Sequence, residues 1–149
     1  MNTNDSLFAS GKLKIILADA QGHIIDERDV DNLVVTAGRT YIASRMKDAT
    51  ATAMTHMAVG TGSTAAVIGD TTLGTEIAAS RVALTSTVAS TNTIVYVATF
   101  GSGVGTGAIT EAGIFNAASV GTMLCRTVFS VVNKAAGDTM NITWTITIS

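Results

Sequence analysis

Bulky apolar side chains and polar side chains alternate with a period of two along several stretches of this chain. The clearest alternation lies in residues 141–149, where apolar residues alternate with threonine: Ile142, Thr143, Trp144, Thr145, Ile146, Thr147 and Ile148. Successive side chains of a β-strand point to opposite faces of its sheet. The pattern therefore predicts a strand with its apolar face toward a core and its threonine face toward solvent.

The centre of the chain carries two apolar runs around a glycine-rich loop. Residues 94–100 and 109–115 are rich in β-branched and aromatic side chains, and glycine recurs between them at every second position from 101 to 107. This pattern predicts a strand, a loop and a returning strand. Counting similar segments elsewhere, we expect about eight strands without βαβ alternation, and therefore a mainly β fold, a β-sandwich or jelly-roll-like domain.

One short helix is predicted near the N-terminus, over residues 36–48. Thr36 is a suitable N-cap residue, and the residues expected to share an inner helix face are Ala37, Tyr41, Ile42 and Met46. Residues 1–48 also hold most of the charged side chains of the chain. This shift in composition indicates a charged segment attached to an uncharged β core.

We therefore expect a polar N-terminal arm over residues 1–11 and a single β-rich domain over residues 12–149. Within that domain, residues 12–48 would form a charged hairpin plus helix, and residues 55–149 the β core. Leu7 and Phe8 are the sizeable apolar side chains of the arm. In an assembly they could anchor the arm on a neighbouring subunit.

The composition of the chain favours an assembled protein. Charged residues make up 13% of the sequence, about half the usual share. A surface with so few charges is poorly protected against association, which suggests that other subunits cover much of it. The net charge of −2 gives no electrostatic case for nucleic-acid binding. No apolar run is long enough for a membrane helix, and no secretion signal is recognised, so we expect synthesis in a cytoplasm.

The sequence offers few groups for catalysis or for a cofactor. The glycine loop lacks the following helix and the Gly-Lys-Ser/Thr ending of a phosphate-binding loop. The acidic cluster Asp26–Asp31 raises a calcium site as one interpretation, but it lacks the pattern of an EF-hand, and a solvated strand face explains it more simply. Glu111 stands among apolar neighbours and needs a partner, for which Arg81 or Arg126 is available. We expect no catalytic residue, no metal and no cofactor.

Three segments together resemble small virion proteins of tailed bacteriophages. They are His56–Gly62 (HMAVGTG), Gly69–Glu76 (GDTTLGTE) and Ile109–Asn116 (ITEAGIFN), and Arg81 also matches the layout. Proteins of this kind are described as capsid decoration or cement proteins and as tail or collar-fibre proteins. The resemblance implies a β-sandwich or jelly-roll module that forms oligomers and binds other virion subunits, and it brings no functional site.

The resemblance implies a non-enzymatic virion structural protein, first of all a capsid decoration or cement protein. Its partners would be the major capsid protein or other virion subunits and further copies of itself, for example in a trimer. The residues expected at the partner interface are Leu7, Phe8, Lys12, Lys14 and Arg28. The alternatives are a tail, collar or fibre-attachment protein and a receptor- or carbohydrate-binding module.

Overall fold

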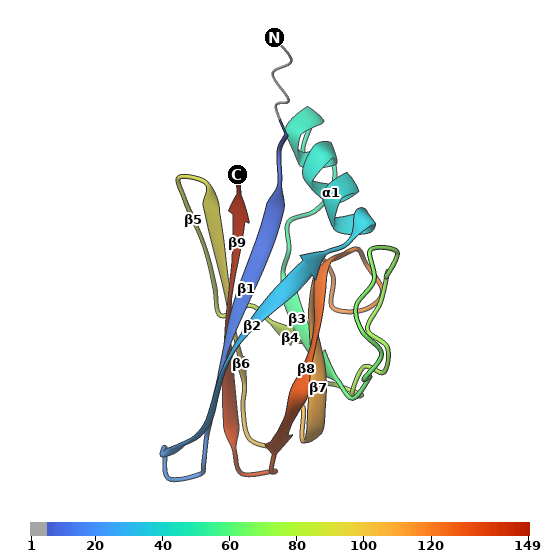
Figure 1. The fold of residues 1–149 in the computed structure, drawn as a ribbon. Coiled ribbons are helices and arrows are strands. Elements are labelled where there is room, and N and C mark those ends of the chain that lie inside the picture. The colour runs from blue at the N-terminus through green and yellow to red at the C-terminus, as the bar shows by residue number, and fades with distance from the viewer. Residues whose placement is uncertain (1–5) are drawn as a thin grey trace.

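In a computed structural model, residues 6–149 are described and form a mainly β structure with one short helix (Figure 1). The strands are β1 (Ala9–Ala18), β2 (Ile24–Val34), β3 (His56–Gly60), β4 (Val82–Ala83), β5 (Ser86–Ser90), β6 (Thr93–Phe100), β7 (Gly107–Phe115), β8 (Met123–Lys134) and β9 (Thr139–Ile148). The helix α1 (Thr36–Lys47) lies between β2 and β3. The mainly β class and the short helix near the N-terminus are confirmed.

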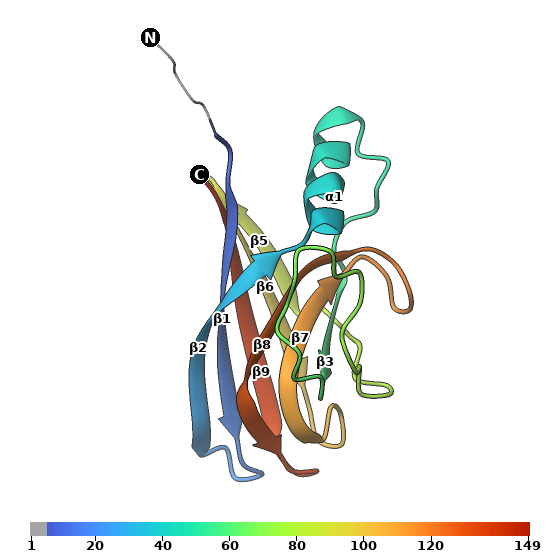
Figure 2. The ribbon, with the colours of Figure 1, turned by 45° about the vertical axis from the view of Figure 1, so that its right-hand side comes forward.

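The nine strands within residues 6–149 belong to one antiparallel sheet, in the order β4-β3-β7-β8-β2-β1-β9-β6-β5. This sheet curls into a half-barrel, which replaces the two facing sheets of the predicted sandwich (Figures 1 and 2). Leu84 and Thr85 connect β4 directly to β5, so the two ends of the sheet are adjacent in the chain. A strand that buries one face has the same alternating sequence in a sandwich and in a curled sheet, so the pattern could not distinguish them.

The charged hairpin of β1 and β2 occupies the middle of the sheet. β1 pairs with β9 along its whole length, and β2 meets β8 at Leu33 and Val34. The hairpin is therefore a central part of the sheet rather than an appendage. β1 starts at Ala9, so the last part of the predicted arm belongs to the sheet, and the backbone of Phe8 already pairs with that of Ser149.

The inner face of the half-barrel holds the main core, which includes Leu13, Ile15, Phe100 and Trp144, all fully buried. Two turns meet at the lower end of this core in Figure 1. The Gly103 N–H donates to the Ala136 carbonyl at 2.8 Å, and the buried Lys134 ammonium donates to the Gly101 carbonyl at 2.9 Å. The glycine loop thus closes one end of the half-barrel, and its strands β6 and β7 lie apart in the sheet instead of pairing with each other.

Helix α1 lies at the opposite end of the half-barrel (Figure 2). Tyr41 and Ile42 pack against the core, but Met46 is 76% exposed, so its predicted place on the inner face is wrong. The helix has Val35 as its N-cap residue and no side-chain cap, so the predicted capping by Thr36 is also wrong. Gly38 is the buried residue of α1. It lies so close to β8 that a Cβ there would overlap the Leu124 carbonyl. Close contact at one glycine positions this helix more than an apolar stripe does.

A long loop, residues 61–81, covers the outer face of β3, β7 and β8. Leu73 of this loop joins a second small core with Val35, Ala58, Phe115 and Met123. Most of β3, Glu111–Phe115 of β7 and Met123–Thr127 of β8 are therefore buried on both faces of the sheet. The covering loop contains the segment Gly69–Glu76 and Arg81 of the phage-like motif, and the rest of the motif lies mainly on β3 and β7.

Candidate functional site

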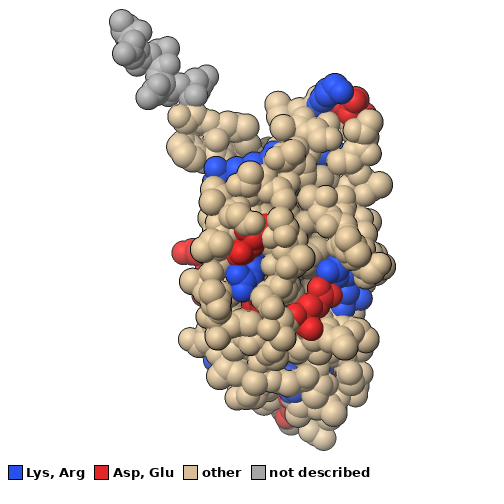
Figure 3. Space-filling model, turned by 90° about the vertical axis from the view of Figure 1, so that its right-hand side faces the viewer, with Lys and Arg blue, Asp and Glu red and all other residues tan. Residues whose placement is uncertain are grey.

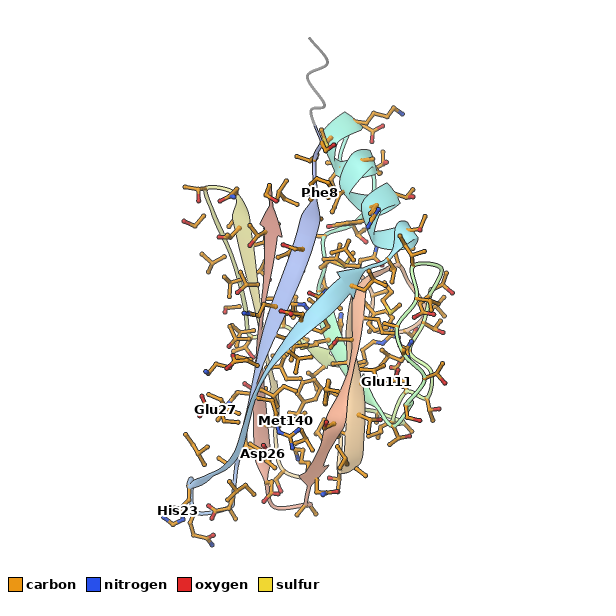
Figure 4. All side chains as sticks on the ribbon, viewed as in Figure 1. Phe8, His23, Asp26, Glu27, Glu111 and Met140 are labelled. Carbon is orange, nitrogen blue, oxygen red and sulfur yellow. The ribbon has the colours of Figure 1, made fainter. Side chains whose placement is uncertain are left out.

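The Glu111 carboxylate on β7 lies between the sheet and the covering loop, and no part of this residue is exposed (Figure 4). It accepts hydrogen bonds from three backbone N–H groups of the loop: Gly62 at 2.9 Å, Gly74 at 2.8 Å and Thr75 at 2.6 Å. Gly62 lies at the start of the loop, and Gly74 and Thr75 lie in its second half. One side chain therefore fixes two distant parts of the loop to the sheet.

Arg126 on β8 supplies the positive charge of this site. Its guanidinium pairs with Glu111 at 2.8 Å and with Asp70 at 2.7 Å, and it also donates to the Thr64 carbonyl at 3.0 Å. Asp70 in turn accepts a bond from the Val67 N–H at 2.9 Å. We call Glu111, Arg126, Asp70 and the N–H groups of Gly62, Gly74 and Thr75 the loop lock. The predicted pairing of Glu111 with an arginine is confirmed for Arg126.

Burial by itself would raise the pKa of Glu111. The N–H groups of Thr75, Gly74 and Gly62 and the Arg126 guanidinium outweigh that effect, so the pKa of Glu111 lies below its ordinary value. The pKa of Asp70 is also lowered, because the bonds from Val67 and Arg126 outweigh the desolvation of its carboxylate. The lock thus holds both carboxylates ionised at neutral pH.

Several glycines of the motif make room for the lock. A Cβ at Gly62 would overlap the Glu111 carboxylate, and one at Gly60 would overlap the Thr75 carbonyl. A Cβ at Gly113 would lie 3.0 Å from the Leu73 side chain and 3.2 Å from the Cys125 carbonyl. The glycines are therefore required by close approach of the loop to the sheet.

Arg81 fixes the end of the covering loop by separate contacts. Its guanidinium lies 3.7 Å from the centre of the Phe115 ring, a cation–π arrangement. It pairs with Glu76 at 2.7 Å and donates to the carbonyls of Ala117 and Val120. The motif residues thus serve the internal structure, and they leave the outer surface as the place where the protein can meet a partner.

The structure separates the five residues predicted at the partner interface. Leu7 and Phe8 are 69% and 65% exposed and lie beside α1, as Figure 4 shows for Phe8. Lys12 and Lys14 lie on the outer face of β1, where Lys14 pairs with Glu27 at 2.8 Å. Arg28 contacts Asp26 and the backbone of β8.

Arg28 bridges the gap that opens where β2 and β8 diverge. Its guanidinium pairs with Asp26 at 2.8 Å and donates to the carbonyls of Ser130 and Val131 on β8. These bonds replace the strand pairing that β2 and β8 have lost in this region. Arg28 therefore contributes to the fold, and its predicted place at a partner interface stays a prediction.

Leu7 and Phe8 form one wall of a groove of about 260 Å³, which we call the end groove. The residues lining it are Leu7, Phe8, Ala9, Arg39, Ile42, Ala43, Met46 and Ile148. Leu7, Phe8 and Met46 are largely exposed there, although they are large and apolar. Exposed apolar side chains gathered around a groove are typical of protein-binding surfaces.

A second, polar groove of about 620 Å³ lies on the outer face of β2, β1 and β9. Threonine, lysine and aspartate dominate its lining, which consists of Ser10, Gly11, Lys12, Lys14, Asp29, Asp31, Asn32, Thr143, Thr145 and Thr147. We call it the outer groove. It is wide and shallow, and no aromatic side chain is among its lining residues.

The acidic cluster is divided between the two faces of β2. Asp26 pairs with Arg28, while Glu27 and Asp29 share Lys14. Among residues 6–149, no group of three histidine, cysteine or acidic side chains is arranged to hold a metal ion. In the same part of the chain, no helix has the length and apolar character needed to cross a membrane. Cys125 is fully buried, which raises the pKa of its thiol.

The face of the molecule drawn in Figure 3 is mostly uncharged, and most of its charged side chains lie in mixed groups of both signs. Contacts with a partner on such a face would depend chiefly on shape and apolar area. The sequence analysis named Leu7 and Phe8 as interface residues, and they form one wall of the end groove. It did not name the residues of the opposite wall. Met46 was assigned to the core because its helical spacing matches that of Ile42.

Replacing Glu111 with glutamine tests the loop lock. Glu111→Gln leaves the buried Arg126 without this ionic partner and removes one of the oxygens that accept N–H bonds. We expect a loss of about 3–5 kcal/mol in the free energy of unfolding at pH 7. Urea denaturation followed by the fluorescence of Trp144 measures it. The matched control is Glu76→Gln, which breaks a partly exposed pair and should cost about 1 kcal/mol or less.

The same variant tests how the free energy of unfolding depends on pH. A lowered pKa in the folded state gives stability that is complete above the ordinary pKa of 4.5 and is lost as the pH falls through the folded value. The wild-type protein should therefore lose more stability than Glu111→Gln between pH 6 and the acid range. Equal losses for Glu111→Gln and Glu76→Gln at pH 7 would contradict the lock.

No protein-family model, curated protein sequence or solved structure matches this chain. The likeness to phage virion proteins therefore remains a prediction from the three motif segments and Arg81.

Proposed function

We propose that this protein is a non-enzymatic structural protein of a tailed-phage virion, in first place a capsid decoration or cement protein. The observation that carries the proposal is the end groove, where Leu7, Phe8 and Met46 present apolar surface on a chain with 13% charged residues. Non-covalent cement proteins act by burying area across neighbouring subunits and need no reactive group. The proposal places the major capsid protein or another virion subunit in this groove.

The use of the motif residues supports the same proposal. Glu111 and Arg126 are charged and buried, and Asp70 is partly buried, yet each is satisfied by internal contacts in the loop lock. In this proposal the motif specifies a rigid β module, and the partner is bound elsewhere on its surface. The curled sheet then takes the part of the predicted jelly-roll module, and further copies of the chain join it in a symmetric oligomer.

Two alternative functions differ in where the protein is found and in which groove it uses. A tail, collar or fibre-attachment protein would use the end groove in the same way at another place in the virion. A carbohydrate-binding module is favoured by the outer groove, whose threonine hydroxyls and charged side chains could bind sugar hydroxyls. Aromatic side chains, which commonly stack on sugar rings, are not part of its lining.

The copy number of this chain in purified virions tests the proposal. Quantitative mass spectrometry against the major shell protein should give a copy number comparable to that of the shell protein. A small multiple of the tail symmetry would assign the protein to the tail or collar. Absence from the virion would contradict the structural role and favour the carbohydrate-binding alternative.

Substitutions in the end groove test which surface binds the particle. The double variant Leu7→Ser and Phe8→Ser removes exposed apolar surface outside the sheet, so the fold should persist while particle binding falls at least about tenfold. Co-sedimentation with particles that lack the protein measures binding. Val67→Ser, which changes another exposed apolar residue in the covering loop, is the matched control. Unchanged binding of the double variant would exclude the end groove as the docking surface.

A further inference from the structure

Strand β5 (Ser86–Ser90) forms one end of the sheet and is the outermost strand on the left of Figure 1. Within the described part of the chain it pairs with β6 alone, and all its residues are exposed. The opposite end of the sheet is β4, which is only Val82–Ala83 long. The two ends thus differ, because one is a very short strand and the other is an open strand.

The register shows which backbone groups of β5 face outward. Ser90 lies opposite Thr93 across the turn at Thr91 and Asn92, and Val88 lies opposite Val95. The Ile148 N–H donates to the Asn92 carbonyl, so Asn92 and every second residue after it direct their backbone groups at β9. Thr93 and Val95 therefore face Ser90 and Val88. It follows that Thr87 and Ala89 direct their N–H and C=O groups away from the sheet.

Strand β5 carries none of the usual features that protect a sheet edge. Its sequence, Ser-Thr-Val-Ala-Ser, has no charge and no proline, and its pairing with β6 runs without a bulge. Natural sheets commonly protect an exposed edge with lysine, proline, a bulge or a covering segment. An uncharged and regular edge is a site for adding another strand.

A groove of about 370 Å³ borders this edge on the inner side of the sheet. It is lined mostly by apolar side chains from β5, β6, α1 and the segment before β3: Tyr41, Ile42, Arg45, Met46, Ala53, Met54, Thr87, Ala89, Ile94 and Tyr96. A strand added to β5 would cover part of this groove. Such an addition would therefore gain apolar burial as well as backbone hydrogen bonds.

We propose that a second copy of this chain pairs with β5, antiparallel and about a two-fold axis at Val88. Thr87 of each copy then exchanges both backbone hydrogen bonds with Ala89 of the other. Val88, which is 58% exposed, meets Val88 of the partner at a non-hydrogen-bonded position, where side chains come closest. The resulting dimer has one sheet that continues through both subunits.

The sequence of β5 is the reason to assign the edge to a second copy. Across the axis Ser86 faces Ser90, Thr87 faces Ala89 and Val88 faces itself, so only uncharged side chains of small or medium size meet. A charged edge would repel itself about such an axis. This inference concerns self-association and stands independently of the virion role.

Charge substitutions at Val88 test the two-fold register. Sedimentation velocity over a micromolar concentration series should show the wild type shifting from the mass of one chain toward twice that mass, because a contact of this size is weak. Val88→Lys and Val88→Glu should each remain monomeric, since like charges meet at the axis. An equimolar mixture of the two variants should dimerise again, because opposite charges then face each other.

One control and one further variant accompany this test. Val67→Lys makes the same change at another exposed valine and should dimerise like the wild type. Ala89→Pro removes an outward N–H and leaves the pairing with β6 intact, so it should also be monomeric. Far-ultraviolet circular dichroism and the fluorescence of the buried Trp144 show whether each variant is folded.

Three results would overturn the inference. The first is a wild type that stays monomeric throughout the series, and the second is dimerisation of Val88→Lys alone. The third is failure of the mixed charge variants to associate, which would indicate another register or a strand from a different protein at this edge. None of these results bears on the copy number of the protein in virions.

Discussion

The burial of one ion pair, Glu111 with Arg126, constrains much of this structure. An ionised carboxylate inside a protein is tolerated only when nearly all of its hydrogen-bonding capacity is used. Here the donors are Arg126 and the N–H groups of Gly62, Gly74 and Thr75, so the start of the covering loop and its second half must come to the same point on β7. That convergence requires glycine at 60 and 62, and it places Leu73 against Gly113 in the second core. A sequence motif that resembles a family signature thus has a physical explanation in this chain.

The strands and the helix could largely be predicted from the sequence, but their arrangement could not. The alternation from Ile142 to Ile148 identifies a strand with one buried face, and Trp144 and Ile146 are indeed buried. The same alternation does not say which strands are neighbours, so the insertion of the β1–β2 hairpin between β8 and β9 could not be foreseen. Met46 was misplaced for a related reason. Helical spacing gives the residues that share a face, but contact of Gly38 with β8 decides how that face is turned.

The candidate surfaces were predicted in part. Exposure of Leu7 and Phe8 follows from their place in a polar segment ahead of the first strand. Arg28 was predicted at the interface because its charge lies in a charged hairpin. Its contacts with Ser130 and Val131 could not be foreseen, because they depend on the separation of β2 from β8. The need of Glu111 for an arginine could be deduced from its apolar neighbours, whereas the contribution of Asp70 could not, because residues 70 and 126 meet only through the covering loop. Internal locking and outward apolar surfaces are together consistent with the rigid module that we propose.

Hydrogen exchange of three backbone amides tests the central claim most directly, namely that the motif residues lock the loop to the sheet. Gly62, Gly74 and Thr75 donate to Glu111 and should exchange at pH 7 as slowly as core amides of β7, while exposed loop amides such as that of Gly69 exchange fast. In Glu111→Gln these three amides should lose most of their protection together. Fast exchange of the three amides in the wild-type protein would contradict the lock, and so would unchanged protection in Glu111→Gln.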